Sequence, residues 1–427
     1  MSKSRNPDHV RRTNVPGPSN EVITERLTML VKPVIESLAE ECRQLGVRDR
    51  ILNFPRLVAM VLTILWRQVP SRRELTRLVR REDLLWSEAE DVSQVAVNNR
   101  FLTFPAILFE RLTNALLPTL NARWLSRTNR PLPVSIAAAR PYFDHIWMID
   151  GSTLEALFRH LDSLKKVSVG QLAGKMFAVL DMVTQLPVTL WFDENPMTHD
   201  TQFLDQLLAL LRPKTLLVFD LGFYDFTFFN NLRLKGSHFI TRLKSNASFK
   251  TIETLNWTAT IHDRLISLGS GQHKTPILTL RLVEVKFGGL WYHYLTSVLD
   301  PHLLPAVVVA DLYRRRWNIE SAFKIIKRLL NLGYLWTGSV NGVLLQVWGT
   351  WLFYAILVDL GDAVADALGL KWECISLEMV YRGLYHFHQA YLKGLAHDLI
   401  AFLIAPENKD LGIVKANPNA LGPPLPI

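Results

Sequence analysis

The spacing of apolar residues changes along the chain and divides it into regions of different type. Between about residues 21 and 129, apolar residues recur every three or four positions, which is the spacing of amphipathic helices. From residue 140 they instead form short runs rich in strand formers, with helices predicted at 201–211 and about 226–234. This order of strands and helices predicts a mixed α/β layer fold. The runs are HIWMID, KMFAVLDMV, PVTLWF, TLLVFD and HFITRL.

A second group of strands is predicted later in the chain. The runs ILTLRLVEVKF and LWYHYLTSV lie between glycine-containing turns, so residues 241–299 are expected to form a β-rich insertion. One helix is then predicted through YRRRWNIESAFKIIKRLL, because Ile319, Phe323, Ile326 and Leu330 line up as an apolar stripe.

The most apolar segment, VLLQVWGTWLFYAILVDL at residues 343–360, approaches the length of a membrane span. Gln346 and Asp359 shorten the uninterrupted apolar run to about a dozen residues, which is typical of a buried core helix. We therefore expect a buried helix here and no membrane partner.

Composition narrows the class of protein. A chain of 427 residues is long enough for several domains. Its net charge of +9 and pI near 9.5 favour a polyanionic partner. Cys42 and Cys374 are the only cysteines, too few for a disulfide framework or a cysteine metal cluster, and the N-terminus lacks the apolar core of a signal peptide. A cytoplasmic location is expected.

Basic residues cluster in the helical region. Arg72, Arg73 and Arg77 follow Ser71, and Glu74 stands three residues after that serine, as in a capping box that opens a helix. Such a helix suits contacts with a DNA duplex, but it also suits a solvated face of a helical bundle. The sequence leaves both interpretations open.

Tyr313, Arg316, Glu320 and Lys327 share one side of the helix predicted around them. At about 100° per residue they fall within roughly 60° of one another around the helix axis. The apolar stripe lies on a different side, so the charged strip is available for chemistry. The alternative is a solvated pair, because Arg316 and Glu320 are four residues apart.

Two aspartates follow predicted strands. Asp150 comes after IWMI, and Asp220 comes after LLVF. A carboxylate at a strand end has a fixed backbone and an accessible side chain. Either aspartate alone is compatible with a turn residue. Their coincidence with Glu320 favours a shared site.

Three carboxylates supply hard oxygen ligands, which suit Mg²⁺ and also Mn²⁺. Two such ions about 4 Å apart can activate a water or a 3′-hydroxyl in phosphoryl transfer. In this interpretation Arg316 and Lys327 hold the phosphates beside the scissile bond.

The pattern Y-x2-R-x3-E-x6-K, formed by Tyr313, Arg316, Glu320 and Lys327, resembles the signature of bacterial insertion-sequence transposases of the DDE type. IDGSTL around Asp150 and DLGFY from Asp220 resemble that family's two aspartate motifs. The sequence THD at residues 198–200 resembles a histidine–aspartate pair that members of this family carry ahead of the core helix. From the residues alone, His199 and Asp200 either support the carboxylates or cap the following helix.

The resemblance implies an RNase H-like catalytic core interrupted by the β-rich insertion, with Asp150, Asp220 and Glu320 as catalytic, metal-binding residues. It also implies DNA contacts by the other members of the strip, and a base-stacking tryptophan, for which Trp257 is the candidate. A small aromatic core of the insertion is the competing interpretation of its tryptophans. Leu221 departs from the polar or basic residue that many relatives carry after the second aspartate.

The expected domain layout covers the whole chain. We expect a disordered basic tail at 1–20, a helical DNA-binding domain at 21–135, and an RNase H-like core at 140–240 and 300–340, interrupted by the insertion at 241–299. C-terminal helices at 341–405 and a tail at 406–427 complete the chain.

The predicted function is that of a DNA transposase, which cleaves at the ends of its own element and joins the 3′-hydroxyl to target DNA. Double-stranded DNA is the expected partner, with a homodimer in the DNA complex and a nucleoid-associated location. The alternatives are a metal-dependent DNA nuclease without strand transfer and a catalytically silent DNA-binding descendant.

Overall fold

The computed structural model describes residues 20–47, 49–154, 174–195, 197–269, 276–332, 336–337 and 339–416. The tail predicted at 1–20 lies outside these residues apart from Asn20. The predicted C-terminal tail is described as far as residue 416. Its first part is folded: Pro406–Leu411 forms the 3₁₀ helix η8, and Ile413 is buried.

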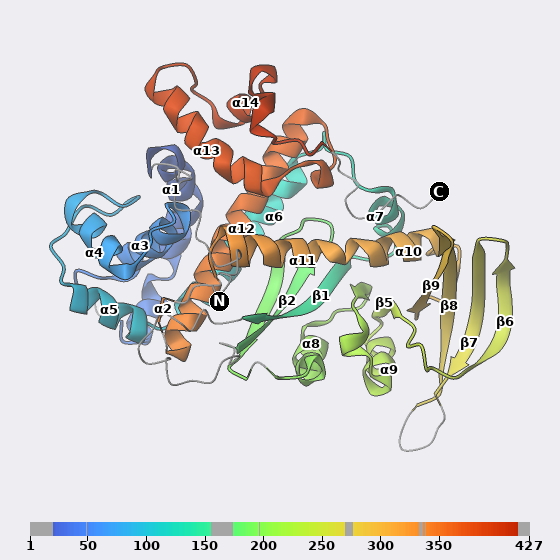
Figure 1. Cartoon of the computed structure of the whole chain (residues 1–427). Coiled ribbons are helices and arrows are strands. Elements are labelled where there is room, and N and C mark those ends of the chain that lie inside the picture. The colour runs from blue at the N-terminus through green and yellow to red at the C-terminus, as the bar shows by residue number, and fades with distance from the viewer. Residues whose placement is uncertain are drawn as a thin grey trace, which may run out of the picture.

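The helical spacing at the start of the chain is confirmed by helices α1 to α7 (Figure 1). Side-chain caps begin several of them, because the first turn of a helix leaves N–H groups unpaired. Ser71 Oγ accepts the N–H of Glu74 at 3.2 Å, as the capping pattern predicted. The helices are α1 (Asn20–Ser37), α2 (Ala39–Gln44), α3 (Phe54–Trp66), α4 (Arg72–Arg81), α5 (Gln94–Thr103), α6 (Ile107–Ser126) and α7 (Val134–Ala139).

The described strands form one mixed sheet in the order β3-β2-β1-β4-β5-β9-β8-β7-β6. Strand β4 is parallel to both β1 and β5, while the other neighbouring strands pair antiparallel. The strands are β1 (His145–Leu154), β2 (Gly174–Asp181), β3 (Pro187–Asp193), β4 (Thr215–Val218), β5 (His238–Arg242), β6 (Phe249–Trp257), β7 (Ile261–Leu268), β8 (Leu278–Phe287) and β9 (Leu290–Thr296).

Helices cover both faces of the first part of this sheet. Because side chains alternate along a strand, Ile146 and Met148 of β1 join one apolar core, and Trp147 and Ile149 join another. The second core contains α8 (Leu204–Leu210) and α9 (Phe226–Leu234), while the first contains α3, α6 and the later helices (Figure 1). The mixed α/β layer architecture is therefore confirmed.

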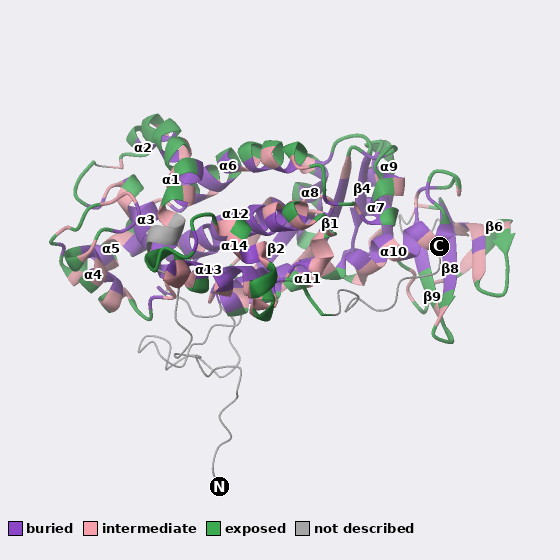
Figure 2. Cartoon of the chain, turned by 90° about the horizontal axis from the view of Figure 1, so that it is seen from above, coloured by how far each residue is buried: buried purple, intermediate pink, exposed green. Residues whose placement is uncertain are grey.

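Helix α12 (Val340–Leu368) runs through the first core. It is long and apolar enough to cross a membrane, yet 94% of its most apolar window is buried inside the protein. Figure 2 shows buried residues gathered along α12 and the neighbouring strands, with exposed residues on outlying elements such as α2 and β6. The buried core helix expected from the sequence is thus observed.

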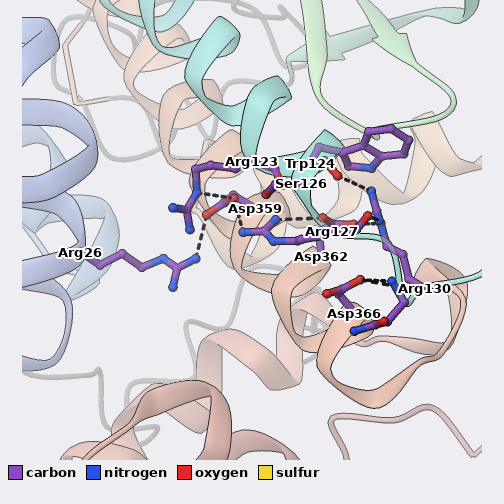
Figure 3. Close-up of polar contacts among 10 residues, drawn as sticks. Arg26, Arg123, Trp124, Ser126, Arg127, Arg130, Asp359, Asp362 and Asp366 are labelled. Carbon is purple, nitrogen blue, oxygen red and sulfur yellow. Dashed lines mark hydrogen bonds and ion pairs between the residues drawn. The ribbon is translucent and has the colours of Figure 1, made fainter.

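Acidic side chains of α12 form buried ion pairs with the N-terminal helices (Figure 3). Asp359, 3% exposed, lies 2.7 Å from Arg26 of α1, 2.9 Å from Arg123 of α6, and 2.7 Å from Arg127. Asp362 pairs with Arg127 at 2.8 Å and also with Arg130. This network, the α12 clamp, joins segments more than 200 residues apart in sequence.

Strands β6 to β9 extend the sheet beyond β5 as an antiparallel group. Arg281 of β8, fully buried, pairs with Asp263 of β7 at 2.6 Å and donates to the carbonyl of Leu304 at 2.7 Å. These bonds attach the group to the start of α10 (Ala306–Arg315). The described part of the segment predicted as a β-rich insertion therefore contains β6 to β9, in one continuous sheet with β1 to β5.

The single helix predicted from Tyr313 onward is divided into three. Helix α10 ends at Arg315, α11 spans Trp317–Lys324, and a π-helical turn, η6, spans Ile325–Leu329. Arg316 retains helical dihedral angles (φ −51°, ψ −32°), so the helix axis continues across it. The π turn adds a residue to the helical repeat and shifts Lys327 relative to a uniform helix.

The C-terminal region is also helical. Helix α13 packs on the outer side of α12, and Tyr381 from α13 donates to the carbonyl of Trp66 in α3 at 2.6 Å. The elements are η7 (Trp372–Cys374), α13 (Leu377–Leu392) and α14 (Leu399–Ile404).

Candidate active site

Asp150 lies within β1 and not at its end, since the strand continues to Leu154. The parallel pairing of β1 with β4 stops at Met148, whereas pairing with β2 continues through Asp150. One side of β1 is consequently open at this position. By strand alternation the Asp150 side chain shares the face of Met148, on which α11 packs.

Asp220 follows β4 by two residues, because the strand predicted to end at Asp220 stops at Val218. It caps the short 3₁₀ helix η5 (Leu221–Phe223), and its Oδ1 accepts the N–H of Gly222 at 2.8 Å. The parallel neighbours β1 and β4 thereby bring Asp150 and Asp220 to the same region of the sheet.

Glu320 comes from α11 and is connected to Asp150 through Arg316. The Nη1 of Arg316 lies 2.9 Å from Asp150 Oδ2, and its Nη2 lies 3.5 Å from Glu320 Oε1. The Arg316 side chain is 6% exposed, whereas that of Glu320 is 32% exposed. A buried guanidinium therefore bridges two of the three predicted catalytic carboxylates.

The charges at this site influence one another. Burial raises the pKa of Asp150 to about 6, and the Asp220 and Glu320 charges add to that rise, although Arg316 opposes it. Burial alone lowers the pKa of Arg316, but Asp150, Tyr313 and the other two carboxylates outweigh it and raise that pKa. The three carboxylates therefore lie within electrostatic reach of one another and of one guanidinium.

A fourth carboxylate belongs to the same region. Asp200, the first residue of η4 (Asp200–Phe203), forms an ion pair with Lys175 of β2, whose Nζ also donates to the carbonyl of Thr198 at 2.8 Å. A Cβ on Gly222 would overlap Asp200 Oδ2, and a Cβ on Gly151 would lie 3.0 Å from Asp200 Oδ1.

Asp200 is therefore packed against the residues that follow both Asp150 and Asp220. The sequence offered a supporting or a capping role for it, and no side-chain cap begins η4. No sequence signal pointed to Lys175, because it stands alone in an apolar strand.

Tyr313 and Lys327 are held by contacts within the protein. Tyr313 is 7% exposed, its ring packs against Tyr294 at 5.2 Å between centroids, and burial raises its pKa. The Arg316 guanidinium lies 5.8 Å from the Tyr313 ring centroid. Lys327 donates from Nζ to the carbonyl of Thr153 at 2.6 Å, which ties η6 to the end of β1.

The other predicted DNA contacts lie elsewhere. Arg72, Arg73 and Arg77 are in α4, where Arg77 pairs with Glu74 at 2.7 Å and remains 58% exposed at its side chain. Trp257 ends β6, at the opposite end of the molecule from α4 (Figure 1).

Trp257 is 57% exposed, so the interpretation of the tryptophans as a small core does not hold for it. Its ring stacks on His262 at 3.6 Å, and His262 stacks on Trp291 at 4.2 Å. Arg264 and Lys286 lie over the two tryptophan rings, at 5.4 and 6.0 Å from their centroids. The result is a basic and aromatic surface at the sheet edge.

The donor set suits a divalent ion, since carboxylate oxygens are the ligands that Mg²⁺ and Mn²⁺ prefer. Within the residues that the structure describes, however, no three His, Cys, Asp or Glu side chains converge closely enough to hold one. The Arg316 guanidinium stands between Asp150 and Glu320 instead. The residues fit the ion in chemistry, and their side chains have to rearrange to bind it together.

Comparison with known proteins gives three findings. Residues 146–355 match the family described as the transposase DDE domain, and this range includes Asp150, Asp220 and Glu320. The putative transposase y4zB of Sinorhizobium fredii (strain NBRC 101917 / NGR234) is 29% identical over 221 residues, which are 47% of this chain and 60% of that protein. The transposase InsG for insertion sequence element IS4 of Escherichia coli (strain K12) is 28% identical over 194 residues, 43% of each chain.

The chain thus spans about half the length of the curated relatives it matches. Among solved structures, a piggyBac transposase synaptic complex with hairpin DNA matches with a TM-score of 0.40 and 12% identity. That match covers 93% of this chain and 86% of the other.

Proposed function

Because residues 146–355 form a transposase DDE domain like those of bacterial insertion-sequence transposases, we propose that this protein cleaves DNA at the ends of its own insertion element and joins the exposed 3′-hydroxyl to target DNA. The observation that carries the proposal is the grouping of Asp150, Asp220 and Glu320 around Arg316. Mutual repulsion among three carboxylates makes the site receptive to added positive charge.

Dependence on divalent metal is general for this family. In our proposal Asp150, Asp220 and Glu320 hold the ions, with Mg²⁺ or Mn²⁺ as the candidates. These residues would hold a divalent ion, whose chemistry would be to activate a water or hydroxyl nucleophile and to stabilise the leaving oxygen.

Arg316 has two tasks in this proposal. In the metal-free protein its guanidinium neutralises Asp150 and Glu320 and holds them near each other. Its planar donor fork is also suited to a phosphate oxygen, so it contacts the DNA backbone when DNA is bound. Tyr313 supports it through a ring contact, and Lys327 completes the strip beside the end of β1.

The remaining DNA contacts are assigned on exposure and charge. The arginines of α4 bind the duplex backbone, and Trp257 stacks on an unpaired base. The net charge of +9 supports association with DNA. We further propose a homodimer in the DNA complex, since cutting paired ends requires a site for each.

The fold proposal follows from strand order. The arrangement β3-β2-β1-β4-β5, with β2 antiparallel and β4 parallel to β1, supports an RNase H-like core. Strands β6 to β9 between that core and α10 support an inserted β-rich unit, preceded by the helical DNA-binding domain at 21–135.

The test is strand cleavage with labelled element ends, a plasmid target and Mg²⁺. Replacing Asp150 or Asp220 with asparagine, or Glu320 with glutamine, is expected to abolish cleavage while end binding is largely retained. Glu378→Gln, at an exposed pair on α13, serves as the control and should cleave normally. Full cleavage by any one of the three site variants would overturn the assignment of that residue.

The same assay separates the alternatives. Joined products are made by a transposase, whereas a nuclease gives nicks without joining. A catalytically silent descendant binds ends and gives neither product at any Mg²⁺ or Mn²⁺ concentration.

A further inference from the structure

A cavity of about 540 Å³ opens in the helical region, between the loop that joins α2 to α3 and the start of α5. It is lined by Arg50 and Leu52 from the loop and by Ser93 and Arg100 from the α5 side. Figure 1 places α3 and α5 on the far side of α12 from strands β1 and β5. The cavity is therefore separate from the carboxylate site.

Arg100 is the unusual member of the lining. Its Nε and Nη2 atoms are buried and have no hydrogen-bond acceptor among the residues that the structure describes. The guanidinium is fixed 4.7 Å above the ring centroid of Phe104, which is fully buried. Charged donors withdrawn from water without an acceptor destabilise a protein, so a turn of the Arg100 guanidinium toward an acceptor in the cavity would be favoured.

The cavity carries a second uncompensated positive charge. Arg50 is exposed, and no ion pair or hydrogen bond of its side chain is found in the described ranges. Asp91 is the acidic residue of the lining, but its Oδ1 is engaged by Arg80 at 2.5 Å. The balance of charge at the cavity is thus positive, and its charged donors are the guanidinium groups of Arg50 and Arg100.

We propose that this cavity binds a phosphate group, with Arg100 and Arg50 as its ligands. Guanidinium groups match phosphate oxygens in geometry and charge. The volume exceeds that of a bare phosphate and leaves room for the attached sugar of a DNA backbone. Assigning the phosphate to DNA rests on the proposed function, whereas the site itself rests on the unsatisfied donors of Arg100.

The first arm of the test uses inorganic phosphate and the full chain. Thermal unfolding is measured in phosphate and in chloride at equal ionic strength, for wild type, Arg100→Met and Arg50→Gln. Phosphate is expected to raise the melting temperature of wild type but not of Arg100→Met. In chloride, Arg100→Met is expected to melt no lower than wild type, because methionine still packs on Phe104 and removes the unpaired donors.

The second arm measures the affinity of the same proteins for duplex DNA over a range of salt. Arg100→Met is expected to bind about tenfold more weakly, the effect of removing one charge-assisted hydrogen bond. The slope of log affinity against log salt should become shallower by about 0.9 for each phosphate that the variant no longer neutralises. Arg43→Gln is the matched control, since Arg43 is exposed in α2, pairs with Glu40 and does not line the cavity.

The outcomes are distinct. Phosphate stabilisation that requires Arg100, with DNA affinity unchanged, supports the site and assigns it to free phosphate. No phosphate effect together with unchanged DNA affinity overturns the proposal. The proposal is also overturned if Arg100→Met melts below wild type in chloride while Arg50→Gln matches wild type in both thermal unfolding and DNA affinity. Arg100 would then stabilise the fold and not bind phosphate. The phosphate arm uses no DNA, so a failure to bind element ends counts against the proposed function alone.

Discussion

Asp150 is placed where its neutral form is favoured. Burial and the charges of Asp220 and Glu320 raise its pKa to about 6, even though Arg316 touches it at 2.9 Å. When folding raises the pKa of an acid, its protonated form stabilises the folded protein at pH values below the pKa of the unfolded state. This contribution is lost as the pH rises through the pKa of the folded state. At neutral pH the metal-free site therefore stores unfavourable charge, which a bound cation relieves.

This predicts a pH-dependent gain in stability for Asp150→Asn. In chelator, the variant should match wild type near pH 4 and exceed it by up to roughly 2–3 kcal/mol at pH 8. Asparagine can still accept from Arg316. Denaturant unfolding at both pH values measures the difference, and a gap that does not change with pH would contradict the mechanism. Added Mg²⁺ is expected to stabilise wild type but not the variant.

Gly222 is required by the close packing of Asp200 and Asp220. A Cβ at this position would overlap Asp200 Oδ2 and lie 3.0 Å from Asp220 Oδ1. Gly222→Ala is expected to cost about 1–3 kcal/mol and to reduce cleavage, because the Asp200 carboxylate is displaced from Lys175.

A double-mutant cycle checks the cause. In Asp200→Ala/Gly222→Ala the atom that the new methyl group meets is absent, so the combined loss of stability should be smaller than the sum of the single losses. Additive losses would show that the glycine is needed for another reason.

At the scale of elements, α12 links the helical region to the sheet. Burial by itself raises the pKa of Asp359, but Arg26, Arg123 and Arg127 outweigh it and hold that pKa below its usual value. Ionised Asp359 therefore stabilises the folded protein at pH values above the pKa of the unfolded state. This contribution is lost as the pH falls through the lowered pKa of the folded state.

Asp359→Asn is accordingly expected to destabilise the protein by about 3–5 kcal/mol at pH 7, since three arginines lose a buried counter-charge. The loss should shrink as the pH falls through the lowered pKa of Asp359, where wild type also becomes protonated. Glu378→Gln breaks an exposed pair with Arg382 on α13 and should change stability by less than about 1 kcal/mol. Equal effects from the two variants would argue against the α12 clamp.

At the scale of the whole molecule, the surfaces proposed to bind DNA lie at opposite ends, with α4 and α5 at one end and β6, whose last residue is Trp257, at the other (Figure 1). Glu320 lies between them on the helix that crosses the sheet. Under the proposed function, one DNA duplex would have to pass along the molecule to reach all three.

Substitution of Trp257 tests whether the end of the molecule that carries β6 contacts DNA. Because it is 57% exposed, Trp257→Ala should leave the melting temperature nearly unchanged while weakening complexes with element ends that contain an unpaired base by roughly tenfold. Trp257→Phe should retain most of the affinity, because it keeps an aromatic face. Unaltered binding by the alanine variant would remove Trp257 from the interface.

The type and order of the elements could be predicted from the chain alone. Apolar spacing depends on helical and strand geometry, which is local, so the helices before residue 130, the strands around Met148 and Val218, and the burial of α12 were all predictable. The choice of Asp150, Asp220 and Glu320 as candidates rested on equally local features, namely residue type, the apolar runs before the two aspartates and the helical spacing around Glu320. Their catalytic role stays a prediction.

Which side chains meet was settled by the packing of the folded molecule. Asp150 lies inside β1 because the pairing of β1 with β2 extends further along the strand than its pairing with β4. How far each pairing extends depends on strand register. Arg316 meets Asp150, and Lys175 meets Asp200, because packing joins segments that sequence spacing leaves unrelated. Local periodicity fixes a residue's face, whereas its partner across the core depends on how the whole chain packs.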